Sequence, residues 1–344
     1  MQRSNSSPNP VLVRVWRGEA VESAHRGAWV LVDGSGRALD GAGDFETPIY
    51  ARSAVKSLQA LPLLETGAAD RFAFTEPELA VCAASHDAEA CHVETVRGIL
   101  DRLGLTEEHL RCGPQLPGHP EARRELERLR DRDGEGASPI YNNCSGKHAG
   151  FLALALHLGV PPERYLDPES DGQRLVHAAV AEMAGLAVED VAFGIDGCSA
   201  PTFRLPLRSL GAAFARLTAP DRLAPDRAAS CRRIVRAVTN NPVLLGGSHR
   251  RLDTDLLQAT GGRLYPKIGA EGVYALGVRD AGRALAIKID DGGRRAVYAE
   301  VVGLLERLGL AVGDELAQLE RWTDPVLRNR AGLEVGRLET GEWT

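Results

Sequence analysis

Segments with strand-forming patterns stand at both ends of this chain, and a long helical block separates them. Near the N-terminus, residues 11–16 alternate apolar and polar side chains, and residues 28–32 form an apolar run that ends in turn residues. Near the C-terminus, residues 272–278 and 284–289 form two more such runs, joined by a turn at 280–282. Two short strands joined by a turn pair as an antiparallel hairpin. We therefore expect both ends of the chain to share one antiparallel sheet, unlike the alternating strands and helices of a parallel sheet.

Amphipathic patterns fill the middle of the chain. The expected helices cover residues 53–65, 75–84, 88–103, 120–132, 149–159 and 169–185, with more up to about residue 239 and two after the second hairpin, at 295–308 and 314–322. The fold class is then α/β, of the α+β type. We expect one catalytic unit, residues 1–344, with a sheet lobe from 11–52 and 264–310 and a mainly helical lobe from 53–263. A functional site is expected where the lobes meet, and the loop 133–137 is a candidate lid.

The charge balance limits the partners of this protein. Its net charge is -6, which argues against nucleic acid or an anionic membrane as the main partner. Residues 1–10 are polar and lack the apolar core of a signal peptide, and no apolar run reaches transmembrane length. We therefore expect a cytoplasmic protein whose six cysteines are thiols or metal ligands. The simplest role for Cys82, Cys91, Cys112 and Cys231 is that of a small buried apolar side chain.

Ser53 and Lys56 stand three residues apart at the start of the first expected helix. Positions three apart lie on one face of a helix. A serine hydroxyl becomes a strong nucleophile when a base takes its proton, and a lysine whose pKa is lowered by burial can be that base. The same Ser-x-x-Lys pattern is the first motif of the penicillin-recognising serine enzymes. The alternative is a capping serine beside a solvated lysine, because this spacing is common by chance.

Lys267 and Gly269 precede a C-terminal strand, where the penicillin-recognising enzymes carry their Lys-Thr-Gly motif. The glycine would let a substrate approach the strand backbone, and the lysine would supply positive charge. Ser85, followed by His86, lies between the two lysines in sequence order, and its hydroxyl could form a second couple with Lys267. The alternatives are a hairpin turn with a surface lysine and a polar helix end.

A polar, glycine-containing stretch at residues 140–150 runs directly into an apolar helix. It brings a thiol, a hydroxyl, an amine and an imidazole together in Cys144, Ser145, Lys147 and His148. A turn of this kind leaves backbone N–H groups unpaired at a helix start, where they can hold an anion or an acyl oxygen. A loop that only connected two helices would not need this chemistry.

Cys144 and Cys198 supply two soft ligands that would suit zinc. Their spacing is not that of a zinc finger. His148 is the third ligand that chemistry suggests first, because a lysine such as Lys147 must be neutral to bind a metal. Two unrelated buried cysteines are the alternative. Asp196, beside Cys198, could orient a substrate amine or a lysine of the site.

Several motifs of the chain occur together in a fixed order. They are Arg-Ser-Ala-Val-Lys at 52–56, Ala-Ser-His-Asp at 84–87, Tyr-Asn-Asn-Cys-Ser-Gly-Lys-His-Ala-Gly at 141–150, Asp-Gly-Cys-Ser-Ala-Pro at 196–201, Lys-Ile-Gly-Ala-Glu-Gly at 267–272 and Ala-Ile-Lys-Ile-Asp at 286–290. With them the chain resembles the asparaginase II family, the thermolabile L-asparaginases of the Rhizobium etli type. The resemblance spans roughly residues 11–308, and its most specific parts are 143–148 and 267–272.

This resemblance implies a fold similar to that of the serine β-lactamases and serine-dependent glutaminases, unrelated to the threonine-dependent asparaginases. It implies an L-asparaginase that converts L-asparagine to L-aspartate and ammonia, and a homodimer. Carried onto this sequence, the family's site comprises the pairs Ser53 with Lys56 and Ser85 with Lys267, and the zinc ligands Cys144, Lys147 and Cys198. Substrate contacts are expected from Arg52, His86, Asp196, Gly269 and Glu271.

In the expected mechanism, Ser53 attacks the amide carbon and Lys56 takes its proton. Ammonia then leaves, protonated through Ser85 and Lys267. Two lysines close together should lower each other's pKa. Two other functions stay open: a glutaminase or another amidase or peptidase of the penicillin-recognising fold, and a catalytically silent protein that binds zinc or an amino acid.

Overall fold

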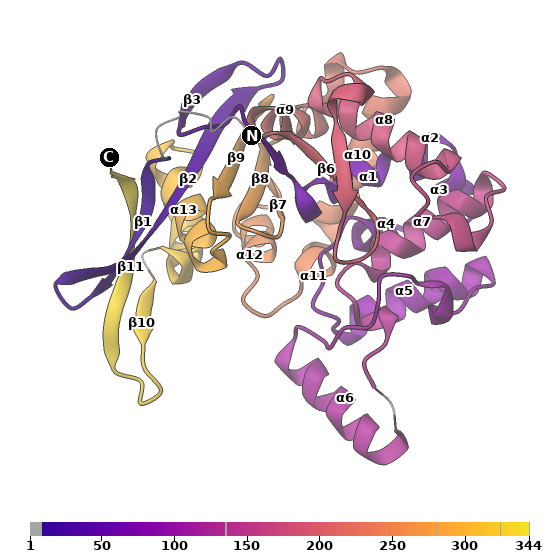
Figure 1. Cartoon of the computed structure of the whole chain (residues 1–344), viewed down its shortest axis with the longest axis horizontal. Coiled ribbons are helices and arrows are strands. Elements are labelled where there is room, and N and C mark those ends of the chain that lie inside the picture. Colours follow the sequence, from indigo (N-terminus) through magenta and orange to yellow (C-terminus); the bar gives the residue numbers. More distant parts are fainter. Residues whose placement is uncertain (1–8, 135, 280, 324, 344) are drawn as a thin grey trace, which may run out of the picture.

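One antiparallel sheet contains strands from both ends of the chain (Figure 1). Across the sheet the order is β10 (Val326–Arg328), β11 (Glu334–Trp343), β1 (Val11–Arg17), β2 (Ala20–Asp33), β9 (Arg283–Ile289), β8 (Val273–Val278) and β7 (Leu264–Ile268), while β3 (Ala38–Ala42) pairs with β2. The N-terminal β2 pairs with the C-terminal β9, from Gly27 opposite Ile289 to Asp33 opposite Arg283. The expected architecture, with one antiparallel sheet built from both chain ends beside a helical block, is confirmed.

The computed structural model describes residues 9–134, 136–279, 281–323 and 325–343. The first eight residues of the polar N-terminal segment, residue 135 of the candidate lid and residue 280 of the expected turn lie outside these ranges. Among the helices of the described ranges, none is both long and apolar enough to cross a membrane.

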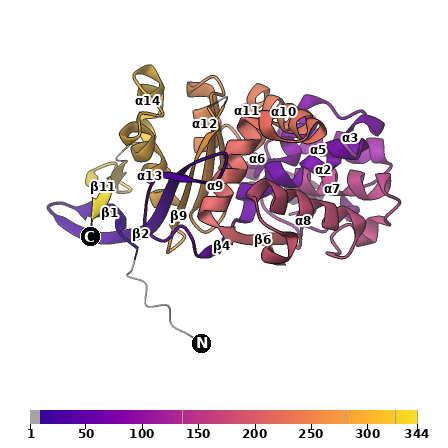
Figure 2. The same ribbon diagram turned by 90° about the horizontal axis from the view of Figure 1, so that it is seen from above.

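Helices cover both faces of the large sheet. α9 (Leu207–Thr218) packs on β2, β8 and β9, and it lies between the sheet and the other helices of the block (Figure 2). α13 (Arg294–Arg307) packs on β1, β9 and β11. Successive residues of a strand point to opposite faces. Val30 of β2 accordingly belongs to the apolar cluster that includes α9, and the next residue, Leu31, belongs to the cluster that includes α13.

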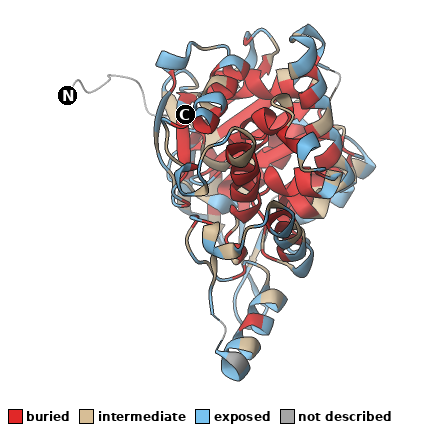
Figure 3. Ribbon diagram, turned by 90° about the vertical axis from the view of Figure 1, so that its right-hand side faces the viewer, coloured by how far each residue is buried: buried red, intermediate tan, exposed pale blue. Residues whose placement is uncertain are grey.

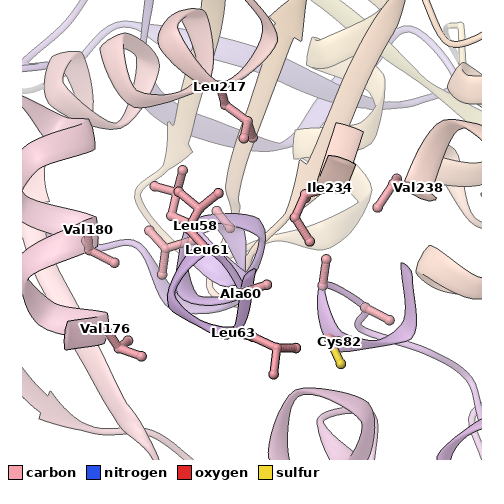
Figure 4. Packing of buried hydrophobic residues seen from close by; sticks show 14 of the residues in the cluster. Leu58, Ala60, Leu61, Leu63, Cys82, Val176, Val180, Leu217, Ile234 and Val238 are labelled. Carbon is pink, nitrogen blue, oxygen red and sulfur yellow. The ribbon is translucent and has the colours of Figure 1, made fainter. Parts of the chain in front are cut away.

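The rest of the helical block consists of short and medium helices. They are α1 (Lys56–Gln59), α2 (Leu61–Glu65), α3 (Ala68–Arg71), α4 (Glu76–Cys82), α5 (Ala90–Leu103), α6 (Pro120–Asp133), α7 (Ser145–His157), α8 (Asp171–Ala184), α10 (Pro225–Asn240), α11 (Pro242–Gly246) and α12 (Leu252–Ala259), and α14 (Asp314–Gln318) follows α13. Figure 4 shows α1 and α2 at the centre of the block, where Leu58, Leu61 and Leu63 pack among the surrounding helices. Figure 3 shows that α6 projects from this core and is mostly exposed.

Two expected elements differ in detail from the structure. The helix expected over residues 53–65 is divided into a 3-10 turn, η1 (Arg52–Val55), followed by α1 and α2, with Pro62 in the first turn of α2. The helix expected from residue 149 begins at Ser145, so part of the polar motif forms the first turn of α7. The helix expected over residues 75–84 corresponds to α4, and Thr75 forms a capping box at its start.

The pair of strands β10 and β11 was missed by the sequence patterns. β10 and β11 extend the large sheet beyond β1, although they carry many charged and few buried side chains. A small second sheet joins β4 (Pro48–Tyr50), β6 (Pro201–Pro206) and β5 (Ala192–Ile195). Short strands of this kind are set by long-range pairing rather than by local periodicity.

All six cysteines are free thiols. Cys82, Cys112 and Cys231 are buried, as expected of small apolar side chains. Cys91 is exposed at the start of α5, so the prediction of a buried side chain was wrong for this cysteine. The amphipathic pattern located its helix, but Cys91 lies on the solvent face of the first turn.

Gly146, within the polar motif, is where α7 touches α4 most closely. A Cβ atom at this position would lie 2.2 Å from the carbonyl oxygen of Val81. We expect Gly146→Ala to lower the free energy of unfolding by about 1–3 kcal/mol, because backbone must move to make room. Gly98→Ala, in a helix position with no atom within 4 Å of the added methyl, should leave stability unchanged or raise it slightly. Urea unfolding of both variants checks this, and equal midpoints would contradict it.

Candidate active site

The candidate site lies where the helical block meets β7, the last strand of the large sheet. η1 carries Ser53 and leads into α1 with Lys56, the segment after α4 carries Ser85, and β7 carries Lys267. A cavity of about 210 Å³ opens here. Its lining residues are Ser53, Ser85, Asn143, Arg251, Ile268, Gly269, Ala270, Glu271, Gly272, Gly292, Arg294, Val297 and Tyr298.

Two lysine amines converge on one serine hydroxyl. Lys267 Nζ donates to Ser85 Oγ at 2.9 Å, and Lys56 Nζ donates to the same oxygen at 3.1 Å. Backbone carbonyls hold both amines in place: Ala84 O lies 2.5 Å from Lys56 Nζ, and Ile268 O lies 2.8 Å from Lys267 Nζ. Both lysine side chains are almost completely buried. Ser85 therefore sits between two amines at the cavity wall.

Burial lowers the pKa of Lys267 to about 7. The positive charges of Lys56 and Arg251 act in the same direction, whereas the carboxylate of Asp253 opposes them. A lysine with a pKa near neutrality exists partly as the free amine, which can accept a proton. The expected lowering of a lysine pKa is thus present at Lys267.

Ser53 is half-buried and lines the cavity, but its hydroxyl has no hydrogen-bond partner within the described ranges. The sequence predicted a shared proton between Ser53 and Lys56. The structure instead directs the Lys56 amine to Ser85, because the carbonyls of Ala84 and Asn143 draw it away from its own helical turn. Ser85 with Lys267 forms the contact that the sequence predicted.

Arg52 and Asp196 form an ion pair beside Ser53, with 2.7 Å between Arg52 Nη2 and Asp196 Oδ1. Burial acts to raise the pKa of Asp196, but the hydrogen bond and charge of Arg52 outweigh it and hold that pKa below its usual value. Arg52 adopts a left-handed backbone conformation with φ of 52°, which is rare for a residue with a side chain. Neither residue lines the cavity.

Gly269 and Glu271 both line the cavity. A Cβ atom on Gly269 would lie 2.7 Å from the carbonyl oxygen of Ala51, so the glycine allows β7 to approach η1 closely. This close packing is sufficient to explain why residue 269 is a glycine, and no contact with a substrate is needed. Glu271, with φ of 60°, forms no ion pair with any residue that the structure describes.

His86 lies deeper than the cavity. Its Nε2 atom is 2.9 Å from Ser145 Oγ, and its ring stacks on His92 with 4.9 Å between centroids. Burial, aided by the nearby charges of His92 and Lys56, lowers the pKa of His86 well below its usual value. His86 is therefore a neutral, buried neighbour of the helix start at Ser145, and it does not line the cavity.

The structure brings the three expected metal ligands together. Lys147 Nζ lies 3.1 Å from Cys198 Sγ, and the neighbouring Cys198 thiol lowers the pKa of Cys144 well below its usual value. All three side chains are buried. Two sulfurs and one nitrogen, converging in a buried pocket, suit zinc. These residues fit the implied metal if Lys147 gives up its proton.

The fit depends on lysine as the third ligand. Within the described ranges, no three side chains from His, Cys, Asp and Glu gather in a way that could hold a metal ion. His148 forms its hydrogen bond with a tyrosine instead of joining the cysteines: its Nδ1 atom lies 2.6 Å from the hydroxyl of Tyr165. Burial lowers the pKa of His148 well below its usual value.

Asn143 links the cysteine cluster to the cavity. Its side-chain oxygen accepts a hydrogen bond from Cys144 Sγ at 3.2 Å, and its backbone oxygen accepts one from Lys56 Nζ at 3.3 Å. Asn143 also lines the cavity. Asn143 belongs to the polar motif, but the sequence does not show that it contacts both Cys144 and Lys56.

Two arginines that line the cavity, Arg251 and Arg294, were not predicted from the sequence. Arg251 is buried, donates to the carbonyl oxygen of Ser85 at 2.5 Å and pairs with Asp87 at 2.6 Å. Arg294 lies at the start of α13. Neither belongs to a short motif with a known mechanism, so only the fold could place them at the site.

The chain was compared with known protein families, curated proteins and solved structures. The sequence matches the family described as L-asparaginase II over residues 13–340, nearly the whole chain. No curated protein matches it in sequence. Among solved structures, it is similar to a β-lactamase from Mycobacterium bovis, at 14% identity over 82% of this chain and 94% of that chain, with a TM-score of 0.40. It is also similar to Mglu, at 16% identity over 84% of this chain and 63% of that chain, with a TM-score of 0.42.

A second structure of Mglu, in its glutamate form, gives a TM-score of 0.38 at 16% identity, and this chain spans 61% of its length. The expected family is confirmed by the sequence match, which makes the chain an asparaginase-type amidohydrolase that acts on a small amino-acid substrate. The protein therefore belongs to the L-asparaginase II family.

Proposed function

We propose that this protein hydrolyses the side-chain amide of L-asparagine to L-aspartate and ammonia. The observation that carries the proposal is the convergence of the Lys56 and Lys267 amines on Ser85, at the wall of the cavity that Ser53 lines. The cavity volume of about 210 Å³ lies below the roughly 300–1,000 Å³ of sites for drug-sized ligands. A small amino acid is the substrate that this volume favours.

Ser53 is the proposed nucleophile. Its hydroxyl attacks the amide carbon, and its proton passes into the network of Lys56, Ser85 and Lys267, where the neutral amine of Lys267 accepts it. The oxyanion that forms is stabilised by backbone N–H groups and by the nearby cations. The lysine charge that appears at Lys267 is compensated in part by the buried carboxylate of Asp253.

Breakdown of the tetrahedral species breaks the carbon–nitrogen bond. The network returns its proton to the leaving nitrogen, and ammonia departs from an acyl-enzyme in which aspartate is esterified to Ser53. A water molecule then attacks the ester carbon and gives a proton to Lys267, which passes it back to Ser53. The sum of these steps is one amide and one water converted to one carboxylic acid and ammonia.

The test of this function is ammonia release by the wild-type protein from L-asparagine, L-glutamine and a chromogenic β-lactam, the last followed by ring opening. Release from asparagine well above that from glutamine supports the proposal. Faster glutamine turnover would make the protein a glutaminase, and β-lactam opening would favour an enzyme of the penicillin-recognising type. No turnover by folded protein would favour a silent zinc-binding or amino-acid-binding role.

Cys144, Lys147 and Cys198 are the residues that we propose to hold zinc. Bound there, zinc would act as a Lewis acid or fix the position of the substrate. Removal of the metal with a chelator separates these roles, since loss of turnover with intact affinity indicates polarisation and weakened affinity indicates positioning. The roles proposed for Ser53, Lys56, Ser85 and Lys267 are the same whether zinc polarises the amide or positions the substrate.

Cys198→Ser should sharply reduce the zinc content of the purified protein, because a hydroxyl replaces one of two thiolate ligands. Cys112→Ser is the matched control: Cys112 is also buried, but its thiol donates to the carbonyl oxygen of Pro139. Metal analysis by mass spectrometry measures both variants. Zinc retained by Cys198→Ser, or lost equally from Cys112→Ser, would rule out this ligand set.

Three further expectations are proposals of the same kind. They are the homodimer, the cytoplasmic location, and the division of one catalytic unit into a sheet lobe and a helical lobe. Sedimentation velocity of the purified protein measures the first, and a monomer at micromolar concentration would contradict it.

A further inference from the structure

A second cavity, of about 420 Å³, shares Arg294 and Tyr298 with the cavity that holds Ser53 and Ser85. Both shared residues belong to the first turns of α13. Arg294 therefore stands at the boundary between the two spaces, within reach of a molecule that enters the site.

Arg294 is exposed, and its guanidinium group has no carboxylate partner within the described ranges. Arg251, its neighbour in the cavity, is neutralised by Asp87 at 2.6 Å, but Arg294 makes no ion pair with any residue in the described ranges. Its guanidinium carbon lies 5.2 Å from the ring centroid of Tyr298. An aromatic face attracts a cation and orients it without removing its charge.

The place of Arg294 in its helix is electrostatically unfavourable. The N-terminus of a helix carries partial positive charge and favours acidic residues. α13 begins with Arg294 and Arg295, and it has no acidic residue in its first turn and no side-chain cap. Conflicts of this kind with local preferences are expected at functional sites. An anion at this position would remove the conflict.

Two buried donor groups lie near Arg294. The Nε atom of Arg251, whose residue is 6% exposed, forms no hydrogen bond with the described residues, and the hydroxyl of Tyr298, whose residue is 4% exposed, has the Arg294 guanidinium beside it. Both residues line the Ser53 cavity. Buried polar groups are normally paired. Donor groups that lack a carboxylate partner at the wall of one cavity match a ligand group with several acceptor lone pairs, and a carboxylate is such a group.

We propose that Arg294, at the wall of the cavity beside the buried donor groups of Arg251 and Tyr298, forms the subsite for the α-carboxylate of the substrate. Glu271 on the wall of the same cavity, also without an ion pair, receives the α-ammonium group. This inference rests on the proposed function and names the residues that select an amino acid rather than a simple amide. Arg294 is a binding residue in this scheme, since it touches the substrate away from the bond that breaks.

The experiment compares Arg294→Gln with Arg250→Gln on three amides. Arg250 is the matched control, because it lines the second cavity alone and is exposed and without an ion pair among the described residues. The substrates are L-asparagine, 3-aminopropanamide, which lacks the α-carboxylate, and succinamic acid, which lacks the α-ammonium. Arg294→Gln should lower kcat/KM for asparagine and succinamic acid by about 10- to 100-fold, mainly through KM. It should change kcat/KM for 3-aminopropanamide by less than about 3-fold, and Arg250→Gln should change all three by less than about 3-fold.

An equal loss on asparagine and 3-aminopropanamide would overturn the carboxylate subsite, because the effect would then not depend on the carboxylate. So would a loss from Arg250→Gln as large as that from Arg294→Gln. If the wild type releases no ammonia from asparagine, the proposed function fails, and binding of L-aspartate by calorimetry takes the place of turnover. Weaker aspartate binding by Arg294→Gln alone would then still support the subsite, and unchanged binding would overturn it.

Discussion

Replacing Ser53 by alanine is expected to reduce kcat for L-asparagine by on the order of 10⁴- to 10⁶-fold, the scale on which loss of a serine nucleophile acts. The variant loses the atom that forms the acyl-enzyme, and water in the cavity is a poor substitute. The Ser53 hydroxyl has no hydrogen-bond partner within the described ranges, so the free energy of unfolding should stay within about 0.5 kcal/mol of wild type. Ammonia release and urea unfolding measure the two effects.

Ser57→Ala is the matched control for this result. Ser57 lies one helical turn away, and its hydroxyl contacts the Tyr265 hydroxyl at 2.9 Å outside the cavity. Its loss should cost about 1 kcal/mol of stability and leave kcat nearly unchanged. If Ser53→Ala kept wild-type turnover while Ser85→Ala lost it, the nucleophile would be Ser85. Peptide mass mapping after an acid quench would locate the aspartyl ester on one serine or the other.

The second large effect concerns Lys267. Its pKa of about 7 predicts that kcat/KM for asparagine rises with pH through this region, because the proposed base acts as the free amine and protonation removes it. Below the pKa, the rate should fall about tenfold for each pH unit. Lys267→Met should lower kcat by about 10²- to 10⁴-fold, the usual contribution of a general base.

The pH profile of the Lys267 variant separates catalysis from structure. If Lys267 is the base, the residual activity of Lys267→Met should lose the inflection near pH 7. An unchanged inflection in the variant would assign the titration to another group. Methionine has nearly the length of lysine and suits a site that is completely buried, so the folded structure should persist. Thermal unfolding of the variant checks this.

Most of the chemistry-bearing side chains could be predicted from the sequence because short motifs hold them. Ser53, Ser85, Lys267 and the three proposed zinc ligands lie in such motifs, all within the part of the chain that matches the family. The sharing of one sheet by both chain ends was also predictable. Strand periodicity and turn residues are local signals, and they can be recognised without any knowledge of the partner strand.

Glycines show where motif reasoning stops. Gly146 and Gly269 were interpreted through the chemistry of their motifs, as parts of a helix-start anion site and a substrate-facing strand. In the structure each one permits a close backbone approach, to Val81 and to Ala51. The absence of a side chain is visible in the sequence, but the atom that fills the space belongs to a distant segment.

The sequence by itself determined the family and the two-ended sheet, and it supplied the candidates for the reactive side chains. Only the tertiary structure decided which amine contacts which hydroxyl. Lys56, Ser85 and Lys267 come from three distant segments, and the choice of Ser85 over Ser53 follows from the backbone carbonyls of Ala84 and Asn143, whose position next to Lys56 is set by the fold. The lowered pKa of Lys267 and the unpaired charge of Arg294 depend likewise on burial and on neighbours far away in the chain. The spacing of residues in a motif describes only near neighbours in the chain. Desolvation and charge change a pKa through space, from residues that are distant in sequence.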